Sequence, residues 1–170
     1  KPLVSLLSFS DHSKVIDICC GSCNLLSAAN HVNKTLNCLG VDICPSELSV
    51  HDTIQADGRV YATEHMGEFD FALANPPFGK AEESEHSKAL LKNNTIGIIS
   101  SRLEVQMLVA NLLLLKKGGT LLIILPSTIV DGPLSINIRK KLAANYHIKA
   151  IVDMPINSFQ PSRIKCSALI

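Results

Sequence analysis

The sequence predicts an α/β fold with a mostly parallel, seven-stranded sheet and helices on both of its faces. Short apolar runs alternate along the chain with segments whose apolar residues recur at helical spacing, which is typical of β–α–β units. Polar residues directly follow four of these runs, and parallel sheets bind their ligands at the carboxyl ends of the strands. Hydrophobic residues make up 46% of the 170 positions, enough for a core without cross-links. We therefore treat residues 1–170 as one domain.

The first elements follow from local patterns. Residues 3–9 predict a short helix with one apolar face, and residues 15–19 predict a buried strand that ends at the Gly21-Ser22 break. Asn24 can cap the next helix, which extends to about Val32. The buried face of that helix is supplied by four apolar residues, Leu25, Leu26, Ala28 and Ala29.

Three further strands are predicted before residue 80, and each one ends at residues that interrupt strands. They cover residues 37–42, 53–56 and 69–74, and they are followed by Pro45, by Asp57-Gly58 and by Asn75-Pro76-Pro77. Pro45 also suits the first turn of a short helix over residues 45–50. The polar segment 81–94 has few apolar residues and predicts a mobile loop.

The second half predicts a long helix over residues 101–117, ended by Gly118-Gly119 as its C-cap. Residues 120–125 form the most apolar run, which predicts a strand in the interior of the sheet. The remaining predictions are a helix over residues 134–145 and strands over residues 147–153 and 164–170.

The net charge, the length of the apolar runs and the two ends of the chain limit the class to which this protein can belong. Sixteen Lys and Arg against 15 Asp and Glu give a net charge of +1, which by itself does not indicate nucleic-acid binding. The apolar runs at 107–115 and 120–125 are shorter than the roughly 20 residues of a membrane span. Without a secretory leader at its start, we expect a soluble, cytoplasmic protein with no membrane contact. The Lys1-Pro2 start and the apolar last residues predict a fragment of a longer chain.

The six cysteines do not predict a metal site. Cys20 and Cys23 have the spacing of half a zinc knuckle, but no second pair of ligands follows. Cys19, Cys20, Cys38 and Cys44 lie in or beside apolar runs, where a free cysteine behaves as a small hydrophobe. We expect no metal, and a zinc or redox protein stays an alternative that metal analysis would test.

The ends of the first three strands indicate a nucleoside cofactor. Gly21 is the only glycine of the first turn, which argues against dinucleotides, whereas S-adenosylmethionine has no phosphate to cradle. Asp42 can accept hydrogen bonds from two ribose hydroxyls, and Asp57 can accept one from an adenine amino group. Taken singly, each acid is better explained as a cap or turn residue. Together with Asp17, at successive strand ends, they favour S-adenosylmethionine.

The segment Asn75-Pro76-Pro77-Phe78 predicts the chemistry. Each proline holds the preceding residue in an extended conformation, so the Asn75 carboxamide and the Pro76 carbonyl are presented rigidly. Both can accept hydrogen bonds from a planar amine and direct its lone pair at a methyl sulfonium, so positioning replaces a strong base. Phe78 can stack on a flipped base. The alternative is that Asn-Pro-Pro only ends a strand.

These motifs resemble adenine-N6 DNA methyltransferases, above all the modification subunits of type I restriction systems. The resemblance continues through residues 116–126, 138–142, 148–155 and 159–166. It implies a Rossmann-like, S-adenosylmethionine-dependent methyltransferase fold in which Asn75, Pro76, Pro77 and Phe78 hold the target adenine. It also implies a set of cofactor-binding residues, namely Asp17, Cys19, Gly21, Ser22, Asp42, Ile43, Asp57 and Asn75. The partners it implies are DNA with a flipped adenine, a separate specificity subunit and a restriction subunit.

Three departures from the family pattern stand out. Cys23 replaces a usual glycine, which predicts crowding of the methionine moiety. Asp57 follows Asp42 by only 15 positions, so the second helix is trimmed. The family's Thr-Pro cofactor motif would lie before Lys1.

Alternatives of other classes remain open from the sequence. Asn-Pro-Pro-Phe also occurs in RNA adenine methyltransferases, and Asn-Pro-Pro-Tyr in enzymes that methylate protein glutamine. The downstream segments favour DNA. A catalytically weak scaffold that binds a nucleoside cofactor is a further alternative, and assays of cofactor binding and adenine methylation would distinguish it.

Overall fold

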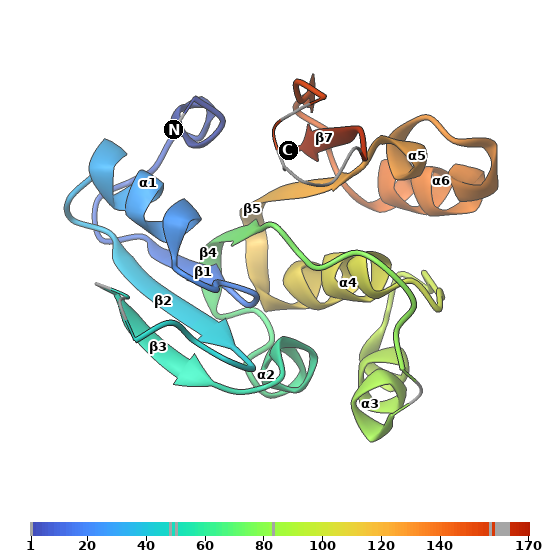
Figure 1. Ribbon diagram of the computed structural model, residues 1–170, viewed down its shortest axis with the longest axis horizontal. Coiled ribbons are helices and arrows are strands. Elements are labelled where there is room, and N and C mark those ends of the chain that lie inside the picture. Colours follow the sequence, from blue (N-terminus) through green and yellow to red (C-terminus); the bar gives the residue numbers. More distant parts are fainter. Residues whose placement is uncertain (1, 48, 50, 83, 157, 159–163) are drawn as a thin grey trace.

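The described part of the chain forms one seven-stranded sheet with strand order β3-β2-β1-β4-β5-β7-β6 (Figure 1). The computed structural model describes all residues except 1, 48, 50, 83, 157 and 159–163. The strands are β1 (Lys14–Asp17), β2 (Asn37–Asp42), β3 (Asp52–Gln55), β4 (Phe69–Ala74), β5 (Leu115–Pro126), β6 (Ile151–Asp153) and β7 (Cys166–Leu169). The helices are α1 (Asn24–Val32), α2 (Gly58–Glu64), α3 (Glu85–Asn93), α4 (Leu103–Leu114), α5 (Ser127–Val130) and α6 (Ile136–Asn145), with 3-10 turns η1 (Val4–Leu6) and η2 (Pro133–Ser135).

Strands β1 to β5 pair with one another in parallel, whereas β7 is antiparallel to both β5 and β6. The predicted mostly parallel sheet is thereby confirmed. The apolar run at residues 120–125 lies between β4 and β7, in the interior of the sheet as expected. Parallel pairing places the carboxyl ends of β1, β2, β3 and β4 on one edge, which gathers their polar residues.

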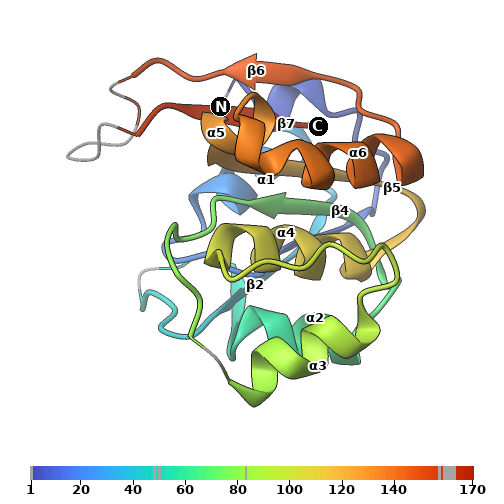
Figure 2. The same ribbon diagram turned by 90° about the vertical axis from the view of Figure 1, so that its right-hand side faces the viewer.

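Helices cover both faces of the sheet, because side chains alternate along each strand. On β1, Val15 packs in one core with Leu26 of α1, while its neighbour Ile16 packs in another core with Leu108 of α4. Figure 2 shows α2, α4 and α6 together in front of the sheet. Among the described residues, no helix is long and apolar enough to cross a membrane.

Two helices were missed by the sequence prediction. α2 starts at Gly58 and is capped by Asp57, whose side chain accepts the Arg59 backbone N–H at 2.8 Å. The segment predicted as a mobile loop contains α3, which Ser84 caps by accepting the Ser87 N–H at 3.2 Å. Both helices are stabilised by their caps and by packing against α4, and neither has a strong apolar repeat of its own.

The predicted helix over residues 45–50 is wrong for the part that the structure describes. Residues 45–47 and 49 are not helical, and the rest of that segment lies outside the described residues. A turn forms instead, in which the Ser49 N–H donates to the Ser46 carbonyl at 3.1 Å. The first predicted helix is also reduced, to the single 3-10 turn η1.

The predicted C-cap at Gly118-Gly119 is wrong as well. α4 ends at Leu114, and the chain enters β5 directly at Leu115. The register with β4 then shifts between the pairs Phe69–Leu115 and Phe71–Thr120. Gly118 takes a φ of +84° in this bulge, and a Cβ on Gly119 would lie 3.1 Å from the Asp70 carbonyl. The two glycines therefore serve a β-bulge rather than a helix end.

Smaller corrections concern the remaining ends. Cys23, not Asn24, is the N-cap of α1 and has a left-handed φ of 59°. Of the strand predicted over residues 147–153, only the last three residues form a regular strand, β6. The Lys149 and Ala150 N–H groups before it both donate to the Ile170 carbonyl. Most of the segment 159–166, on which part of the family resemblance depended, lies outside the described residues.

Gly40 on β2 accommodates two buried cysteines of the first turn. A Cβ at this position would lie 2.7 Å from the Cys20 Sγ and 3.0 Å from the Cys23 Sγ. All six cysteines are free thiols, and the described residues hold no cluster of metal-ligating side chains. Burial raises the pKa of the Cys20 thiol, so this side chain packs as a neutral thiol rather than acting as a thiolate.

We expect Gly40→Ala to lower the free energy of unfolding by about 1 to 3 kcal/mol, because the added methyl overpacks this cluster. Chemical denaturation measures the loss. The double variant Gly40→Ala/Cys20→Ala, which removes the nearest sulfur, should recover part of it. An equal loss in both variants would contradict the assigned contact.

Candidate active site

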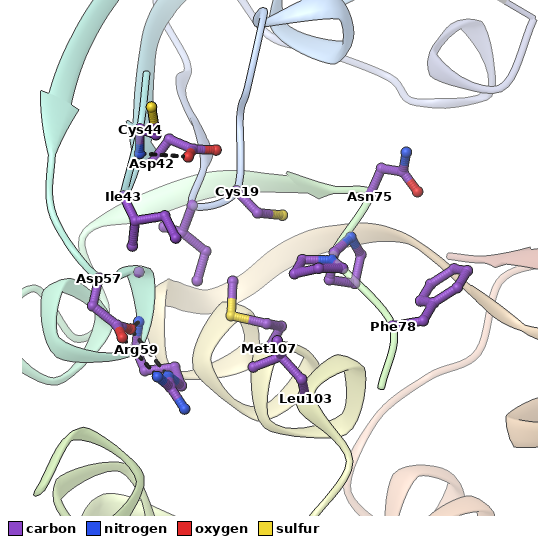
Figure 3. A pocket seen from close by; sticks show the side chains of 14 residues that line it. Cys19, Asp42, Ile43, Cys44, Asp57, Arg59, Asn75, Phe78, Leu103 and Met107 are labelled. Carbon is purple, nitrogen blue, oxygen red and sulfur yellow. Dashed lines mark hydrogen bonds and ion pairs between the residues drawn. The ribbon is translucent and has the colours of Figure 1, made fainter. Parts of the chain in front are cut away.

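A cavity of about 640 Å³ opens at the carboxyl ends of β1, β2 and β4 (Figure 3). Its walls come from the turns after these strands, from the start of α2 and from the first turn and a half of α4. The lining residues are Ile18, Cys19, Asp42, Ile43, Cys44, Asp57, Gly58, Arg59, Asn75, Pro76, Pro77, Phe78, Leu103 and Met107.

The structure brings most of the predicted site residues together. Eight line the cavity, namely Cys19, Asp42, Ile43, Asp57, Asn75, Pro76, Pro77 and Phe78. Three do not: Asp17, Gly21 and Ser22 lie in or behind the first turn. Cys23, predicted to crowd the cofactor, is fully buried against Gly40 and does not line the cavity. Sequence reasoning missed Arg59, Leu103 and Met107 because their helices reach the cavity only through the fold.

Asp42 connects the first turn to the end of β2. Its Oδ2 accepts the Gly21 N–H at 2.8 Å, and its Oδ1 accepts the Cys44 N–H at 2.9 Å. Each oxygen of a carboxylate can accept about two hydrogen bonds, so both oxygens retain an acceptor position. Ile43 follows directly and is 70% exposed, which leaves an apolar surface beside a free acceptor.

Asp17, the last residue of β1, supports the turn that follows this strand. Its side chain is 2% exposed, and its Oδ1 accepts the Cys19 N–H at 3.0 Å. Burial raises the pKa of this carboxyl to about 7, although the hydrogen bonds from Cys19 lower it and the charge of Asp42 adds to the rise. Ser22 lies outside this arrangement, exposed and bonded to the Asn24 side chain at 2.9 Å.

The raised pKa of Asp17 predicts a pH-dependent stability. Between its ordinary pKa of 3.8 and the folded pKa of about 7, the folded state binds the extra proton, so stability falls as the pH rises through this window. Asp17→Asn keeps an acceptor for Cys19 but cannot ionise. We expect its free energy of unfolding, relative to that of wild type, to be about 2 to 3 kcal/mol higher at pH 8 than at pH 5.

Urea denaturation of the ligand-free protein at both pH values measures this difference. Asp52→Asn, an exposed change at the start of β3, is the matched control and should show no such dependence. A constant offset between Asp17→Asn and wild type across the range would contradict the buried-carboxyl assignment.

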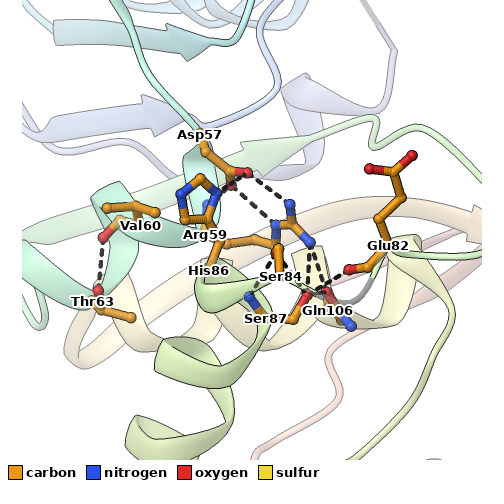
Figure 4. A network of polar contacts seen from close by, with 9 residues as sticks. All are labelled: Asp57, Arg59, Val60, Thr63, Glu82, Ser84, His86, Ser87 and Gln106. Atoms are coloured by element: carbon orange, nitrogen blue, oxygen red, sulfur yellow. Dashed lines mark hydrogen bonds and ion pairs between the residues drawn. The ribbon is translucent and has the colours of Figure 1, made fainter.

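Asp57 is held by a polar network on the other side of the cavity (Figure 4). Its Oδ2 accepts from Arg59 Nη2 at 2.7 Å and from His86 Nδ1 at 3.0 Å, and its Oδ1 accepts from the backbone N and Nε of Arg59. Burial alone would raise the pKa of Asp57, but the hydrogen bonds and charge of Arg59 lower it to about 2. All its acceptor positions are filled, and the most exposed of its partners is His86, whose side chain is half-exposed.

Asn75 directly follows β4 and lies on the wall of the cavity opposite Asp57 (Figure 3). Its side chain is exposed, and its carboxamide makes no hydrogen bond to any other described residue. Pro76 is buried, and Phe78 is half-buried between the cavity and an adjoining groove of about 420 Å³ that it also lines. The wall therefore presents one free carboxamide and one aromatic ring.

This strand order, with an antiparallel β7 beside β5 and a cavity over β1, β2 and β4, defines the Rossmann-like fold of S-adenosylmethionine-dependent methyltransferases. The Eco57I restriction-modification methylase family matches residues 19–160, and the chain belongs to that family. Among curated protein sequences, none matches this chain significantly.

Solved structures share the fold at low sequence identity. A candidate class I S-adenosylmethionine-dependent methyltransferase of Listeria monocytogenes is 19% identical over 98% of this chain, with a TM-score of 0.77. A type I restriction-modification system gives 19% identity over 98% of the chain and a TM-score of 0.79, and the type IIG restriction endonuclease BpuSI gives 14%, 99% and 0.72. The chain covers 55%, 39% and 23% of these three proteins, respectively.

Proposed function

We propose that the protein transfers a methyl group from S-adenosylmethionine to the exocyclic N6 amine of adenine in DNA. The observation that carries this proposal is the position of Asn75-Pro76-Pro77-Phe78 on one wall of a cavity whose other walls hold Asp42 and Asp57. Membership of a restriction-modification methylase family supports both the reaction and the DNA substrate.

The residues of the cavity fit S-adenosylmethionine. Asp42 retains acceptor positions for ribose hydroxyls, and exposed Ile43 offers an apolar face to adenine. Asp57 also lines the cavity and can accept from the adenine amino group when the half-exposed His86 gives up its hydrogen bond. Cys19 lines the cavity beside the first turn. The bound cofactor supplies an electrophilic methyl sulfonium.

The acceptor side needs no strong base. The Asn75 carboxamide oxygen and the Pro76 carbonyl oxygen each accept one N–H of the amine, which draws its nitrogen toward tetrahedral geometry and frees its lone pair for attack on the methyl carbon. The carbon–sulfur bond would break as the carbon–nitrogen bond forms, the thioether product would leave, and the methylated nitrogen would release its extra proton to solvent. Phe78 stacks on the extruded base. Rigid prolines keep both acceptors in place before the reaction, so positioning and electrostatics provide the rate enhancement.

The test is methyl transfer by the full-length protein, with partner subunits added where activity requires them. Duplex DNA, RNA of the same sequence and a glutamine-containing peptide serve as parallel substrates, with N6-methyladenine identified by mass spectrometry. Methylated DNA adenine supports the proposal. Methylation confined to RNA or peptide, or cofactor binding without any transfer, would establish one of the alternatives instead.

DNA and separate specificity and restriction subunits are the partners we propose, in line with the likeness to a type I restriction-modification assembly. We expect residues 1–170 alone to fold, to bind the cofactor weakly and to methylate little DNA. A net charge of +1 cannot supply the several phosphate contacts that non-specific affinity needs. Tight, sequence-specific methylation by these residues alone at physiological salt would contradict this expectation.

A further inference from the structure

Two buried polar side chains flank the surface of α4 that faces the cavity. Leu103 and Met107 line the cavity from the start of this helix. A helix turns about 100° per residue, so Glu104 and Gln106 project about 80° to either side of the Leu103–Met107 stripe. Glu104 is 2% exposed and Gln106 is 7% exposed. Burying a carboxylate and an amide beside an open cavity requires specific partners.

Glu104 holds the backbone that follows Phe78. Its Oε2 accepts the Gly79 N–H at 3.0 Å, and its Oε1 accepts from Arg102 Nε at 2.7 Å, which balances the buried charge. The Gly79 carbonyl in turn accepts the Leu103 N–H at 2.7 Å. Both polar groups of the Gly79 backbone are therefore fixed by the start of α4.

The same loop is tied at two further points. Lys80 and Arg102 form an isolated antiparallel bridge, and the Ala81 N–H donates to the Ser101 carbonyl at 2.7 Å. Gly79 has a φ of +137°, a conformation that side chains rarely adopt. The position of Phe78 thus depends on a turn that requires glycine at position 79 and that the Glu104 carboxylate stabilises.

Gln106 supports the opposite wall of the cavity, which holds Asp57 and Arg59. Its Oε1 accepts from Arg59 Nη1 at 3.0 Å and from Ser87 Oγ at 3.2 Å (Figure 4). Its Nε2 donates to the Ser100 carbonyl at 3.2 Å. Arg59 in turn makes three hydrogen bonds to Asp57. Gln106 therefore orients the guanidinium that positions the Asp57 carboxylate.

We propose that the first turn of α4 positions both sides of the active site. Glu104 fixes the position of the loop that carries Phe78 and Gly79, and Gln106 fixes the position of the cavity wall formed by Asp57 and Arg59. Neither residue lines the cavity, so both act through others: Glu104 through Gly79 and Phe78, Gln106 through Arg59 and Asp57. Because one rigid helix carries both, it fixes the separation of the two walls. This inference rests on the proposed methyl transfer.

The two residues should affect different kinetic constants of the full-length protein. We expect Glu104→Ala to lower kcat about tenfold to a hundredfold with the cofactor Kd within about twofold of wild type. We expect Gln106→Ala to raise the cofactor Kd about fivefold to tenfold while kcat at saturation stays within about threefold. Glu104→Gln keeps an acceptor for the Gly79 N–H and should recover most of the kcat.

A second measurement does not depend on activity. In wild type the Gly79 amide should exchange slowly with solvent, and Glu104→Ala should speed that exchange about tenfold or more while Gln106→Ala leaves it unchanged. Should Glu104→Ala not fold, Glu104→Asp keeps the charge beside Arg102 but shortens the reach to Gly79, and it should show the same changes in smaller degree. Glu85→Gln, an exposed change on α3, is the control without effect.

Parallel losses of kcat and cofactor affinity in both alanine variants, in proportion to a lowered melting temperature, would overturn the proposal in favour of a general structural role. Unchanged Gly79 exchange in Glu104→Ala would also overturn it. A wild-type protein that binds S-adenosylmethionine but never methylates adenine contradicts the proposed function. In that case the Gly79 exchange and the cofactor Kd of Gln106→Ala still decide the positioning roles.

Discussion

Replacing Asn75 with alanine is expected to lower the rate of methyl transfer about a hundredfold or more and to leave the cofactor Kd nearly unchanged. The Asn75 carboxamide lies exposed at the end of β4 and makes no hydrogen bond to other described residues. Its removal therefore leaves no buried group without a hydrogen bond. What the variant loses is an acceptor that acts on the amine as the transition state forms.

Single-turnover methylation by the full-length protein at saturating cofactor measures this loss. Asn145→Ala, an exposed change on α6 that removes the same carboxamide far from the cavity, is the matched control. An Asn75→Ala protein that methylates at the wild-type rate would refute the role of this carboxamide, whatever the identity of the acceptor.

The second large effect is expected at Asp42, where replacement by alanine should weaken S-adenosylmethionine binding about tenfold to a hundredfold. The variant loses a charged acceptor for ribose hydroxyls. It also releases the Gly21 and Cys44 N–H groups, which the two carboxylate oxygens now hold at 2.8 and 2.9 Å. The first turn should therefore loosen together with the loss of the direct contact.

Calorimetric titration separates these two contributions when Asp42→Asn is measured beside Asp42→Ala. The amide keeps one acceptor oxygen for the turn but has lost the charge, so we expect an intermediate affinity. Asp52→Ala, at the opposite end of the neighbouring strand β3, should bind as wild type does. Equal affinity of Asp42→Ala and wild type, with circular dichroism unchanged, would remove Asp42 from the cofactor site.

Parallel-sheet strands and the residues that end them were the most predictable part of the molecule. β2 and β4 were predicted to the residue, because each is a short apolar run followed by residues that interrupt strands. Since parallel strands share one carboxyl edge, Asp42 and Asn75 could be placed at a common site without knowledge of the helices.

The helices α2 and α3 could not be predicted in the same way. Their apolar repeats are weak, and their starts depend on the Asp57 and Ser84 caps, whose residue types also occur in turns. Asp57 shows the ambiguity directly, because one carboxylate caps α2, pairs with Arg59 and lines the cavity. Ser84 with Glu85 in the following first turn was the available signal for α3.

Contacts between distant segments were beyond sequence reasoning altogether. Arg59 and Gln106 are 47 positions apart, and Gly79 and Glu104 are 25 apart. No local pattern pairs them, because their proximity depends on how α4 packs against α2 and against the loop after β4. Burial of Glu104 is likewise a property of the fold, since an acid in the first turn of a helix is ordinarily a solvated one.

The position of β7 has a consequence for how the chain folds during synthesis. β6 is made before β7, yet β7 is its only neighbour among the described strands, and β7 must insert antiparallel between β5 and β6. Until then the apolar β5 keeps an open edge that other chains can pair with. A nascent chain interrupted between Asp153 and Cys166 is therefore aggregation-prone, because the segment that closes the β5 edge has not yet been synthesised.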